Sequence, residues 1–244
     1  RGLGDVYKRQ IEDNVAPTAI CQDATVQLNN DGLGSLTTAE IDNGSSDVCT
    51  GVSLSVSPDN FNCSHVGANA VTLTVADAYL NISTCLANVT VSDTVSPNAV
   101  CQDITVHLDI VGNATANAVD ADAGSNDSCG VNTFNIVPSG YTCTELGSNP
   151  ATLTVGDVNG NTSDCAVNVT VLDTIDPVAA CMPDTVFLDA GGNGTLSSSD
   201  IDNSSSDVCG INSYVVAPNT FTVADVGTNT ASLTISDGSG NSSQ

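Results

Sequence analysis

Apolar and polar residues alternate with a period of two along several short segments of the chain. Val and Leu fall at every second position in ATVQL (24–28), VTLTV (71–75) and ANVTV (87–91). This alternation is typical of strands with one buried face, and no segment shows helical periodicity of useful length. Recurring prolines and sequences such as GSGN mark turns between the segments. The pattern therefore predicts short strands joined by turns.

The same segments recur with a fixed period of 80 residues. The motifs DNVAP, DTVSP and DTIDP begin three copies, and every later motif follows at equal offsets without insertion or deletion. The copies are residues 13–92 (repeat 1), 93–172 (repeat 2) and 173–244 (repeat 3). Repeat 3 stops where the other two have Cys85 and Cys165, so we expect it to be truncated at its C-terminal end.

The spacing of strands and turns indicates the fold class. About seven short strands in each repeat are typical of an immunoglobulin-like β-sandwich. The Trp that pins antibody domains is absent from the chain, so the relation is one of architecture only. We expect an all-β protein that forms a tandem array of three immunoglobulin-like β-sandwich modules.

These motifs resemble those of the hyalin-repeat (HYR) family. The resemblance is carried by CQDITV, by D-x-C-G and by V-G-x-N-x-x-T-L-T-V-x-D-x-x-G-N-x-S-x-C. It is closest to the tandem HYR-like modules of large surface proteins from marine Bacteroidota. It implies an immunoglobulin-like sandwich in an extracellular adhesive or structural protein, without catalytic residues. Repeat 1 departs from the pattern with DAYLN and repeat 3 with CMPD.

All positive charge of Lys and Arg lies in the first ten residues, at Arg1, Lys8 and Arg9. No apolar stretch follows, so the segment does not read as a secretory signal. DVYKRQ is similar to the in-frame translation of a transposon end used to prepare sequencing libraries. We therefore expect residues 1–10 to be foreign to an environmental gene fragment whose true N-terminus is missing, and residues 1–12 to form a disordered lead.

The remaining chain is acidic without any basic partner. Of 28 Asp and Glu residues only Asp5 lies in the first ten positions, which leaves 27 carboxylates and no Lys or Arg. Nucleic-acid binding and attraction to anionic membranes both rest on Lys and Arg, so both are excluded. No run approaches the ~20 apolar residues of a membrane span. Such a surface needs salt or divalent cations.

Ten cysteines at repeating offsets indicate a disulfide framework outside the cytosol. In a sandwich of this type the first and last strands can run parallel, which would bring the first and last cysteine of a repeat together. We favour Cys21–Cys85, Cys49–Cys63, Cys101–Cys165 and Cys129–Cys143. This choice leaves Cys209 as a free thiol, because Val223 replaces its expected partner. The rival pairing, Cys21–Cys49 with Cys63–Cys85, stays open, as does the third pairing that four cysteines allow.

Acidic residues recur in register and are candidate calcium ligands. The pattern [DE]-x-D-x4-D precedes a cysteine in each repeat, and further aspartates stand where repeats join or follow a strand. Ca²⁺ prefers six to eight oxygen ligands from flexible loops. The competing and favoured interpretation is that these carboxylates form turns. The candidates are Glu40, Asp42, Asp47, Asp120, Asp122, Asp127, Asp200, Asp202, Asp207, Asp93 and Asp173, with Asp13, Asp77, Asp157 and Asp237 in the same pattern.

Short DTV and DTI sequences resemble the O-glycosylation signal of Bacteroidota. Thr94 and Thr174, at the repeat junctions, are the better candidates for modification.

Three equivalent repeats without a unique polar constellation favour a structural or adhesive spacer of a large secreted or cell-surface bacterial protein. The expected partner is an extracellular protein or glycan surface, and the expected state is a monomeric array. The alternative is a glycan- or protein-binding module, accessory to an enzyme domain outside this sequence. We do not expect an enzyme, because the chain has no Ser–His–Asp set, HExxH motif or phosphate loop.

Overall fold

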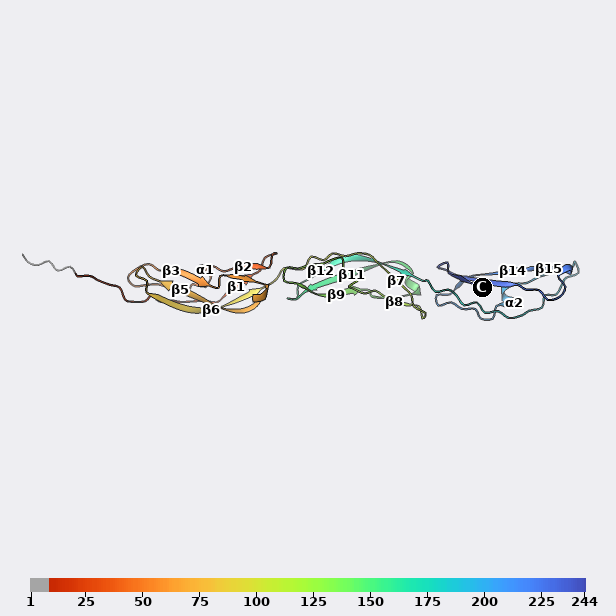
Figure 1. Ribbon diagram of the computed structural model, residues 1–244, viewed down its shortest axis with the longest axis horizontal. Coiled ribbons are helices and arrows are strands. Elements are labelled where there is room, and N and C mark those ends of the chain that lie inside the picture. Colours follow the sequence, from red (N-terminus) through yellow and green to blue (C-terminus); the bar gives the residue numbers. More distant parts are fainter. Residues whose placement is uncertain (1–8) are drawn as a thin grey trace, which may run out of the picture. The chain divides into compact units, whose positions relative to one another are not determined.

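The structure is a computed structural model that describes residues 9–244 (Figure 1). Arg9–Glu12 belong to no helix or strand, and the interpretation of residues 1–8 as a foreign lead lies outside the described residues. The prediction of an all-β protein is confirmed, since strands dominate and each α-helix present in residues 9–244 has four residues. No helix in this part of the chain combines the length and apolar character that a membrane crossing requires.

Repeat 1 forms a four-stranded sheet in the order β1-β6-β5-β3 and a two-stranded sheet of β2 and β4. It therefore has six strands among the described residues rather than about seven. Its elements are β1 (Ala24–Gln27), β2 (Leu33–Ser35), α1 (Thr38–Ile41), β3 (Ser53–Ser57), β4 (Asn60–Asn62), the 3₁₀ turn η1 (Cys63–His65), β5 (Gly67–Ala76) and β6 (Ile82–Ser92).

Repeat 2 has the same strand order, β7-β12-β11-β9, with β8 and β10 paired separately. Its elements are β7 (Ile104–His107), β8 (Asn113–Thr115), β9 (Val131–Val137), β10 (Gly140–Thr142), η2 (Cys143–Glu145), β11 (Gly147–Asp157) and β12 (Thr162–Leu172).

Repeat 3 has a smaller sheet of three strands, β14-β16-β17, beside the pair β13-β15. Its elements are β13 (Asn193–Thr195), α2 (Ser198–Ile201), β14 (Ile211–Ala217), β15 (Thr220–Thr222), η3 (Val223–Asp225), β16 (Ser232–Asp237) and β17 (Ser242–Ser243).

The chain divides into two compact units that do not follow the repeat boundaries. The boundary crosses repeat 2. The loop 126–133 of repeat 2 groups with repeat 1, because a disulfide joins this loop to repeat 1. The expected module boundaries after residues 92 and 172 stay a prediction. The units are Arg1–Asn98 with Asn126–Thr133 and Gly156–Thr162, and Ala99–Ser125 with Phe134–Val155 and Ser163–Gln244.

The parallel pairing expected of the first and last strands is present. In repeat 1, Ala24 lies opposite Val89 and Val26 opposite Val91, while β5 pairs antiparallel with the other edge of β6. The alternating apolar residues point into one core, and each fully buried Val or Leu contributes roughly 1.5–3 kcal/mol. The core of repeat 1 is formed by Val26, Leu28, Leu36, Ile41, Phe61, Val71, Leu73, Val75, Ala87, Val89 and Val91.

The structure contains four disulfides, and two are the favoured pairs. Cys21–Cys85 and Cys101–Cys165 each join the segment before the first strand to the last strand of the same repeat. Their Cα atoms are 5.9 and 6.0 Å apart, within the usual range for a disulfide.

The other two favoured pairs, Cys49–Cys63 and Cys129–Cys143, are wrong. Cys63 is bonded to Cys129 and Cys143 to Cys209, so these disulfides join consecutive repeats. The rival pairing is excluded as well. Among the described residues Cys49 and Cys181 are the free thiols, and Cys209 is not free.

The length of β5 explains why Cys49 does not reach Cys63. Cys63 begins η1, directly before the start of β5, whereas Cys49 lies near Asp77 at the end of that strand. A strand of ten residues spans about 33 Å. The chain leaves β6 at the end where Cys63 lies, because Val91 pairs with Gly67 there. The next repeat therefore follows at the end where Cys63 lies, and Cys129 of that repeat is the cysteine that bonds to Cys63.

Glycine at two turns leaves room for the disulfides between repeats. Gly32 and Gly112 adopt φ values of +70° and +79°, in the left-handed region that glycine tolerates. A Cβ atom on Gly32 would lie 2.7 Å from Cys63 Sγ, and one on Gly112 would lie 3.1 Å from Cys143 Sγ. The turns that carry these glycines pack directly against the sulfur atoms.

The single methionine allows a direct test of the disulfide between repeats 2 and 3. Cyanogen bromide cleaves after Met182, the only methionine of the chain. We expect the two fragments to stay together without reductant, because Cys143–Cys209 spans the cleaved bond, and to separate once reductant is added. Gel electrophoresis with and without reductant gives the readout, with Cys209→Ser as the control that separates in both lanes. Separation of the parent chain without reductant would support the pairing Cys129–Cys143 instead.

Candidate metal centre

Three acidic clusters form from residues that are far apart within each repeat. Each cluster offers ligand atoms that all lie within 4.8 Å of one another. The clusters are Asp13, Asp47 and Cys49 in repeat 1, Asp93, Asp127 and Cys129 in repeat 2, and Asp173, Asp207 and Asp237 in repeat 3. The sulfur of Cys129 is engaged in a disulfide, which leaves two carboxylates in the second cluster.

A turn after β5 positions the first cluster. Asp77 Oδ1 accepts hydrogen bonds from the backbone N–H groups of Tyr79 and Asn81, at 2.8 and 2.9 Å. The Asn81 side chain donates to Asp77 Oδ2 and to the carbonyl oxygen of Asp13. Asn81 thus holds the start of the repeat against the turn. Asn161 and Asn241 make the equivalent contacts in repeats 2 and 3.

A second loop brings the aspartate that precedes a cysteine. Asp47 Oδ2 accepts from the N–H groups of Cys49 and Thr50, and Asp207 Oδ2 accepts from the N–H of Cys209. These bonds use one carboxylate oxygen and turn the other toward the cluster. The D-x-C spacing in the sequence therefore produces an aspartate with one oxygen committed to the backbone.

The remaining carboxylate oxygens lack donors. Five side-chain oxygens of the described residues are buried from solvent without any hydrogen-bond partner, and only Ser243 Oγ lies outside the clusters. Asp173 itself is only 5% exposed. An unpaired charge in such a place is costly. The other four atoms are Asp13 Oδ2, Asp47 Oδ1, Asp173 Oδ2 and Asp207 Oδ1.

A single residue of repeat 2 explains why no oxygen atom of Asp93 is among these unpaired atoms. Asn159 donates its side-chain N–H to Asp93 Oδ2 at 2.7 Å. The equivalent residues, one period away, are Tyr79 in repeat 1 and Ser239 in repeat 3. Neither makes this bond in the structure, so the matching oxygen of Asp13 or Asp173 has no donor.

The geometry of the clusters fits a calcium ion. Ca²⁺ binds oxygen at 2.3–2.6 Å, so the ligand atoms of one ion lie at most about 5 Å apart. Separations within 4.8 Å meet that condition for two carboxylates in repeats 1 and 2 and for three in repeat 3, and the oxygens without donors lie in repeats 1 and 3. Two like charges 4 Å apart repel by about 4 kcal/mol at an effective dielectric constant of about 20. The chain offers no Lys or Arg beyond Arg9 to offset this repulsion.

The aspartates of the turns are stabilised in their charged form. Burial alone would raise the pKa of Asp157, but the hydrogen bonds from Asn161, Asn159 and Gly160 together lower it below its ordinary value. The pKa values of Asp77 and Asp237 are lowered in the same way. The nearby thiol responds in the opposite direction, because the charge of Asp13, followed by burial and a hydrogen bond to Asp13, raises the pKa of Cys49.

Six of the candidate ligands lie outside these clusters. Glu40 closes the N-terminus of α1 by accepting from the N–H and hydroxyl of Thr37, and Asp200 does the same for α2. Asp42 and Asp122 accept from the turn that follows them, through Ser45 and Ser125. The structure thus places the first two acids of the pattern in caps and turns: Glu40, Asp42, Asp120, Asp122, Asp200 and Asp202.

The clusters are formed by the candidates Asp47, Asp127, Asp207, Asp93 and Asp173, joined by Asp13 and Asp237. Sequence reasoning missed Asn81, Asn161 and Asn241, which bind these segments together. Their signal was the spacing of four residues after Asp77, Asp157 and Asp237. Thr94 and Thr174 are exposed beside the clusters, and their glycosylation stays a prediction.

The lowered pKa values make a prediction about acid stability. A carboxyl group with a lowered folded-state pKa stabilises the fold above its unfolded value of about 4, and this contribution is lost as the pH falls through the folded-state pKa. We expect Asp157→Asn to reduce the change in melting temperature between about pH 5 and pH 3. Asp31→Asn, at an exposed turn, is the charge-matched control. An unchanged pH dependence in the Asp157 variant would contradict the assignment.

Comparisons with known proteins give no family. No protein-family model and no curated protein matches the chain, so its resemblance to hyalin-repeat modules stays a prediction. Among solved structures, human CDH23 EC21-23 matches 94% of this chain and 98% of its own at 11% identity and a TM-score of 0.40. Human protocadherin-24 EC1-2 matches 66% of this chain and 100% of its own, at 13% identity and a TM-score of 0.37. Fibronectin(III)-like modules of Clostridium thermocellum CbhA match 64% of this chain and 92% of their own, at 14% identity and a TM-score of 0.23. At these values the neighbours say nothing about what this chain binds.

Proposed function

We propose that the chain is a structural spacer of a secreted or cell-surface protein, in which disulfides tie each repeat to the next. The observation that carries this proposal is the pair of bonds between repeats, Cys63–Cys129 and Cys143–Cys209. Disulfides persist in oxidising compartments, which supports a location outside the cell. The resemblance to hyalin-repeat modules supports a bacterial surface protein with a structural or adhesive role.

The four disulfides overlap along the chain. Each bond begins before the preceding one ends, so every peptide bond between Cys21 and Cys209 is spanned by at least one disulfide. A single cut in the backbone therefore leaves the chain connected in this stretch. Pairs confined to one repeat would leave both junctions unprotected. The overlapping bonds are Cys21–Cys85, Cys63–Cys129, Cys101–Cys165 and Cys143–Cys209.

Calcium is the second part of the proposal. The clusters of repeats 1 and 3 present unpaired buried oxygens at a spacing that suits Ca²⁺. When bound, the ion would neutralise charge that no side chain of residues 10–244 offsets. Asp207 and Cys209 lie on one loop, so the ion and the disulfide Cys143–Cys209 would fix that loop together. Mg²⁺ needs shorter, near-octahedral contacts and keeps its waters, which makes it the poorer fit.

A cut between repeats 1 and 2 tests the spacer proposal. We place a protease recognition site after Ser96, which is exposed in the junction, and hold single molecules under tension by their two ends. We expect tethers to survive proteolysis and to break once reductant is added, because Cys63–Cys129 spans the cut. A variant with Cys63→Ser and Cys129→Ser is the matched control, in which proteolysis alone breaks the tether. Loss of tethers in the parent chain upon proteolysis would contradict the proposal.

The residue that differs between the clusters, Asn159 in repeat 2 and Ser239 in repeat 3, provides a test of calcium binding. At fixed ionic strength we expect about 1 mM Ca²⁺ to raise the melting temperature more than the same concentration of Mg²⁺. Ser239→Asn supplies Asp173 with a donor of the kind that Asn159 gives to Asp93, so this variant should lose one bound ion in calorimetric titration. Asn159→Ser should gain one.

Ser139→Asn, the same substitution at the exposed turn between β9 and β10, which contributes no residue to a cluster, is the control and should bind as the parent does. Equal effects of calcium and magnesium would leave only charge screening. Unchanged stoichiometry in both cluster variants would contradict the assignment of the ion to these oxygens.

A further inference from the structure

The four-stranded sheet of repeat 1 has an outer face that carries no charge. Val71 on β5 and Val89 on β6 point into the core, so the residues that alternate with them point away from it. On this outer face β6 presents Ile82, Thr84 and Leu86, and further along Asn, Thr and Ser. β5 and β3 present Ala, Thr and Ser there, and β1 presents Thr and Gln. None of these outward residues, all within the described part of the chain, is charged, although the chain has 28 acidic residues.

Two large apolar side chains on this face are exposed. Ile82 is 58% exposed and Leu86 is 72% exposed. The equivalent residues of repeat 2, Thr162 and Ala166, are also exposed, although another repeat precedes and another follows them in the chain. The exposure of the outer face therefore does not depend on where a repeat stands in the chain.

The turn that leads into β6 adds a strained and exposed leucine. Leu80 has a φ of +69°, and the residues at its position in repeats 2 and 3 are Gly160 and Gly240, with φ values of +96° and +97°. A residue with a side chain is strained in this left-handed conformation. Leu80 is 82% exposed, so it gains no core packing in return, and Tyr79 beside it is exposed as well. Apolar residues kept in a turn at a cost to the fold point to a contact outside the repeat.

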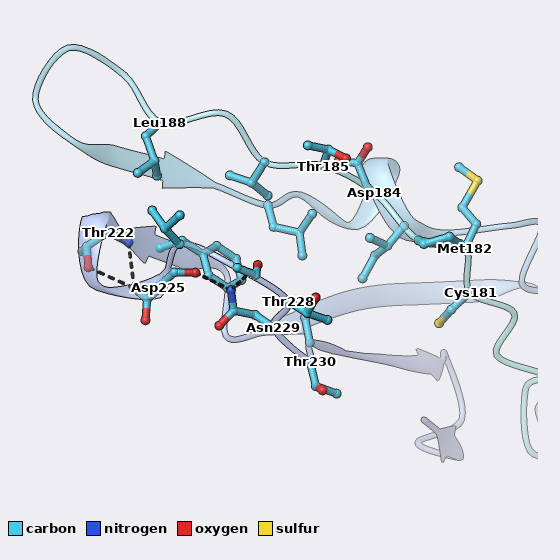
Figure 2. A pocket seen from close by; sticks show the side chains of 18 residues that line it. Cys181, Met182, Asp184, Thr185, Leu188, Thr222, Asp225, Thr228, Asn229 and Thr230 are labelled. Atoms are coloured by element: carbon cyan, nitrogen blue, oxygen red, sulfur yellow. Dashed lines mark hydrogen bonds between the residues drawn. The ribbon is translucent and has the colours of Figure 1, made fainter.

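Comparable surfaces of the other repeats carry carboxylates. In repeat 2, Asp164 stands at the position of Thr84 and accepts a hydrogen bond from the hydroxyl of Thr154 at 2.6 Å. The pocket of repeat 3 in Figure 2 has apolar side chains, but Asp184 and Asp225 are among the residues that line it. Carboxylates at such places oppose contact with another acidic chain. The outer face of repeat 1 lacks this obstacle.

We propose that the outer face of repeat 1 is a contact between two copies of this chain, packed sheet against sheet about a two-fold axis. A second copy has a net charge of −25 and is repelled wherever its carboxylates approach those of the first. A face without charge lets two copies meet with no opposed carboxylates inside the contact. Sheets packed face to face lie about 10 Å apart, which lets side chains such as Ile82 and Leu86 interdigitate.

The area of the outer face suits a weak, reversible dimer. The strands β1, β6, β5 and β3 have 4, 11, 10 and 5 residues. At roughly 3.4 Å per residue and 4.8 Å between strands, they cover about 500 Å². Two copies packed face to face would bury on the order of 1,000 Å² in total, which is the low end for specific interfaces. The monomeric state expected from the sequence then applies at low protein and salt concentration.

Sedimentation equilibrium of the full chain tests the contact. The chain carries Cys49→Ser and Cys181→Ser, which removes the free thiols of the described residues, and the buffer contains a chelator, so that neither disulfides nor calcium link copies. We expect the association constant to rise at least about tenfold from 0.1 to 1 M NaCl, because the Debye length falls from about 10 to about 3 Å and the repulsion between copies is screened.

A substitution taken from repeat 2 locates the contact. Thr84→Asp reproduces Asp164, so the fold accepts it, and it should lower the association constant at 1 M NaCl at least about tenfold, because the contact would bury an unpaired charge. Ser139→Asp adds the same charge at an exposed turn outside the face and should associate as the parent does. A melting curve of each variant checks that it is folded.

Transfer of the face to repeat 2 completes the test. In the chain with Thr84→Asp, the substitutions Thr162→Ile, Asp164→Thr and Ala166→Leu give repeat 2 the outward residues of repeat 1 and should restore salt-dependent association. A parent chain that stays monomeric at about 1 M NaCl would overturn the proposal. Association that Thr84→Asp leaves unchanged, or that the transferred face does not restore, would do the same, since it would assign the contact to another surface.

Discussion

The structure depends on one constraint, the disulfide that joins a loop of each later repeat to the preceding repeat. Cys129 stands two residues after Asp127, and Cys209 two after Asp207. The same short loop therefore carries a covalent link on one residue and a cluster ligand on another. Since the loops also supply the backbone N–H groups that bind these aspartates, linkage between repeats and the geometry of the acidic clusters are set by the same few residues.

Charge explains why such linkage is useful in this chain. After Arg9 no basic side chain offsets the carboxylates, so packed repeats repel each other wherever their acidic ends approach. Hydrogen bonds such as that from Ser128 Oγ to the carbonyl oxygen of Asn30 contribute noncovalent attraction between repeats. A disulfide resists this repulsion at any salt concentration, whereas a bound divalent cation removes part of its cause.

The strands could be predicted because alternation with a period of two is a local signal. The disulfides between repeats could not be predicted, because cysteines at equal offsets have equivalent partners in more than one repeat. Alternation located β1 and β6 as strands, and the expectation that the first and last strands of such a sandwich run parallel led to the pair Cys21–Cys85. The other cysteines repeat every 80 residues, so spacing alone cannot distinguish a partner in the same repeat from one in the next. The informative position was Val223: repeat 3 keeps Cys209 although it has no cysteine at position 223, and this is explained by the pairing of Cys209 with Cys143 of the preceding repeat. The acidic pattern was likewise treated as one set of candidate calcium ligands, although its first two members form a helix cap and a turn.

Small differences between near-identical repeats decide what each cluster can do. Identical positions, such as Asn81, Asn161 and Asn241, maintain the turn that brings the carboxylates together. A single variable position then sets how many oxygens remain without a donor, since an amide at 159 supplies one that a phenol at 79 or a hydroxyl at 239 does not. Because a buried oxygen with a donor gains less from a cation than one without, the repeats need not bind ions equally even though repeats 1 and 2 share one strand order. An array of this kind can vary its response to divalent cations along its length by substitutions at one exposed turn, without altering the core or the disulfides.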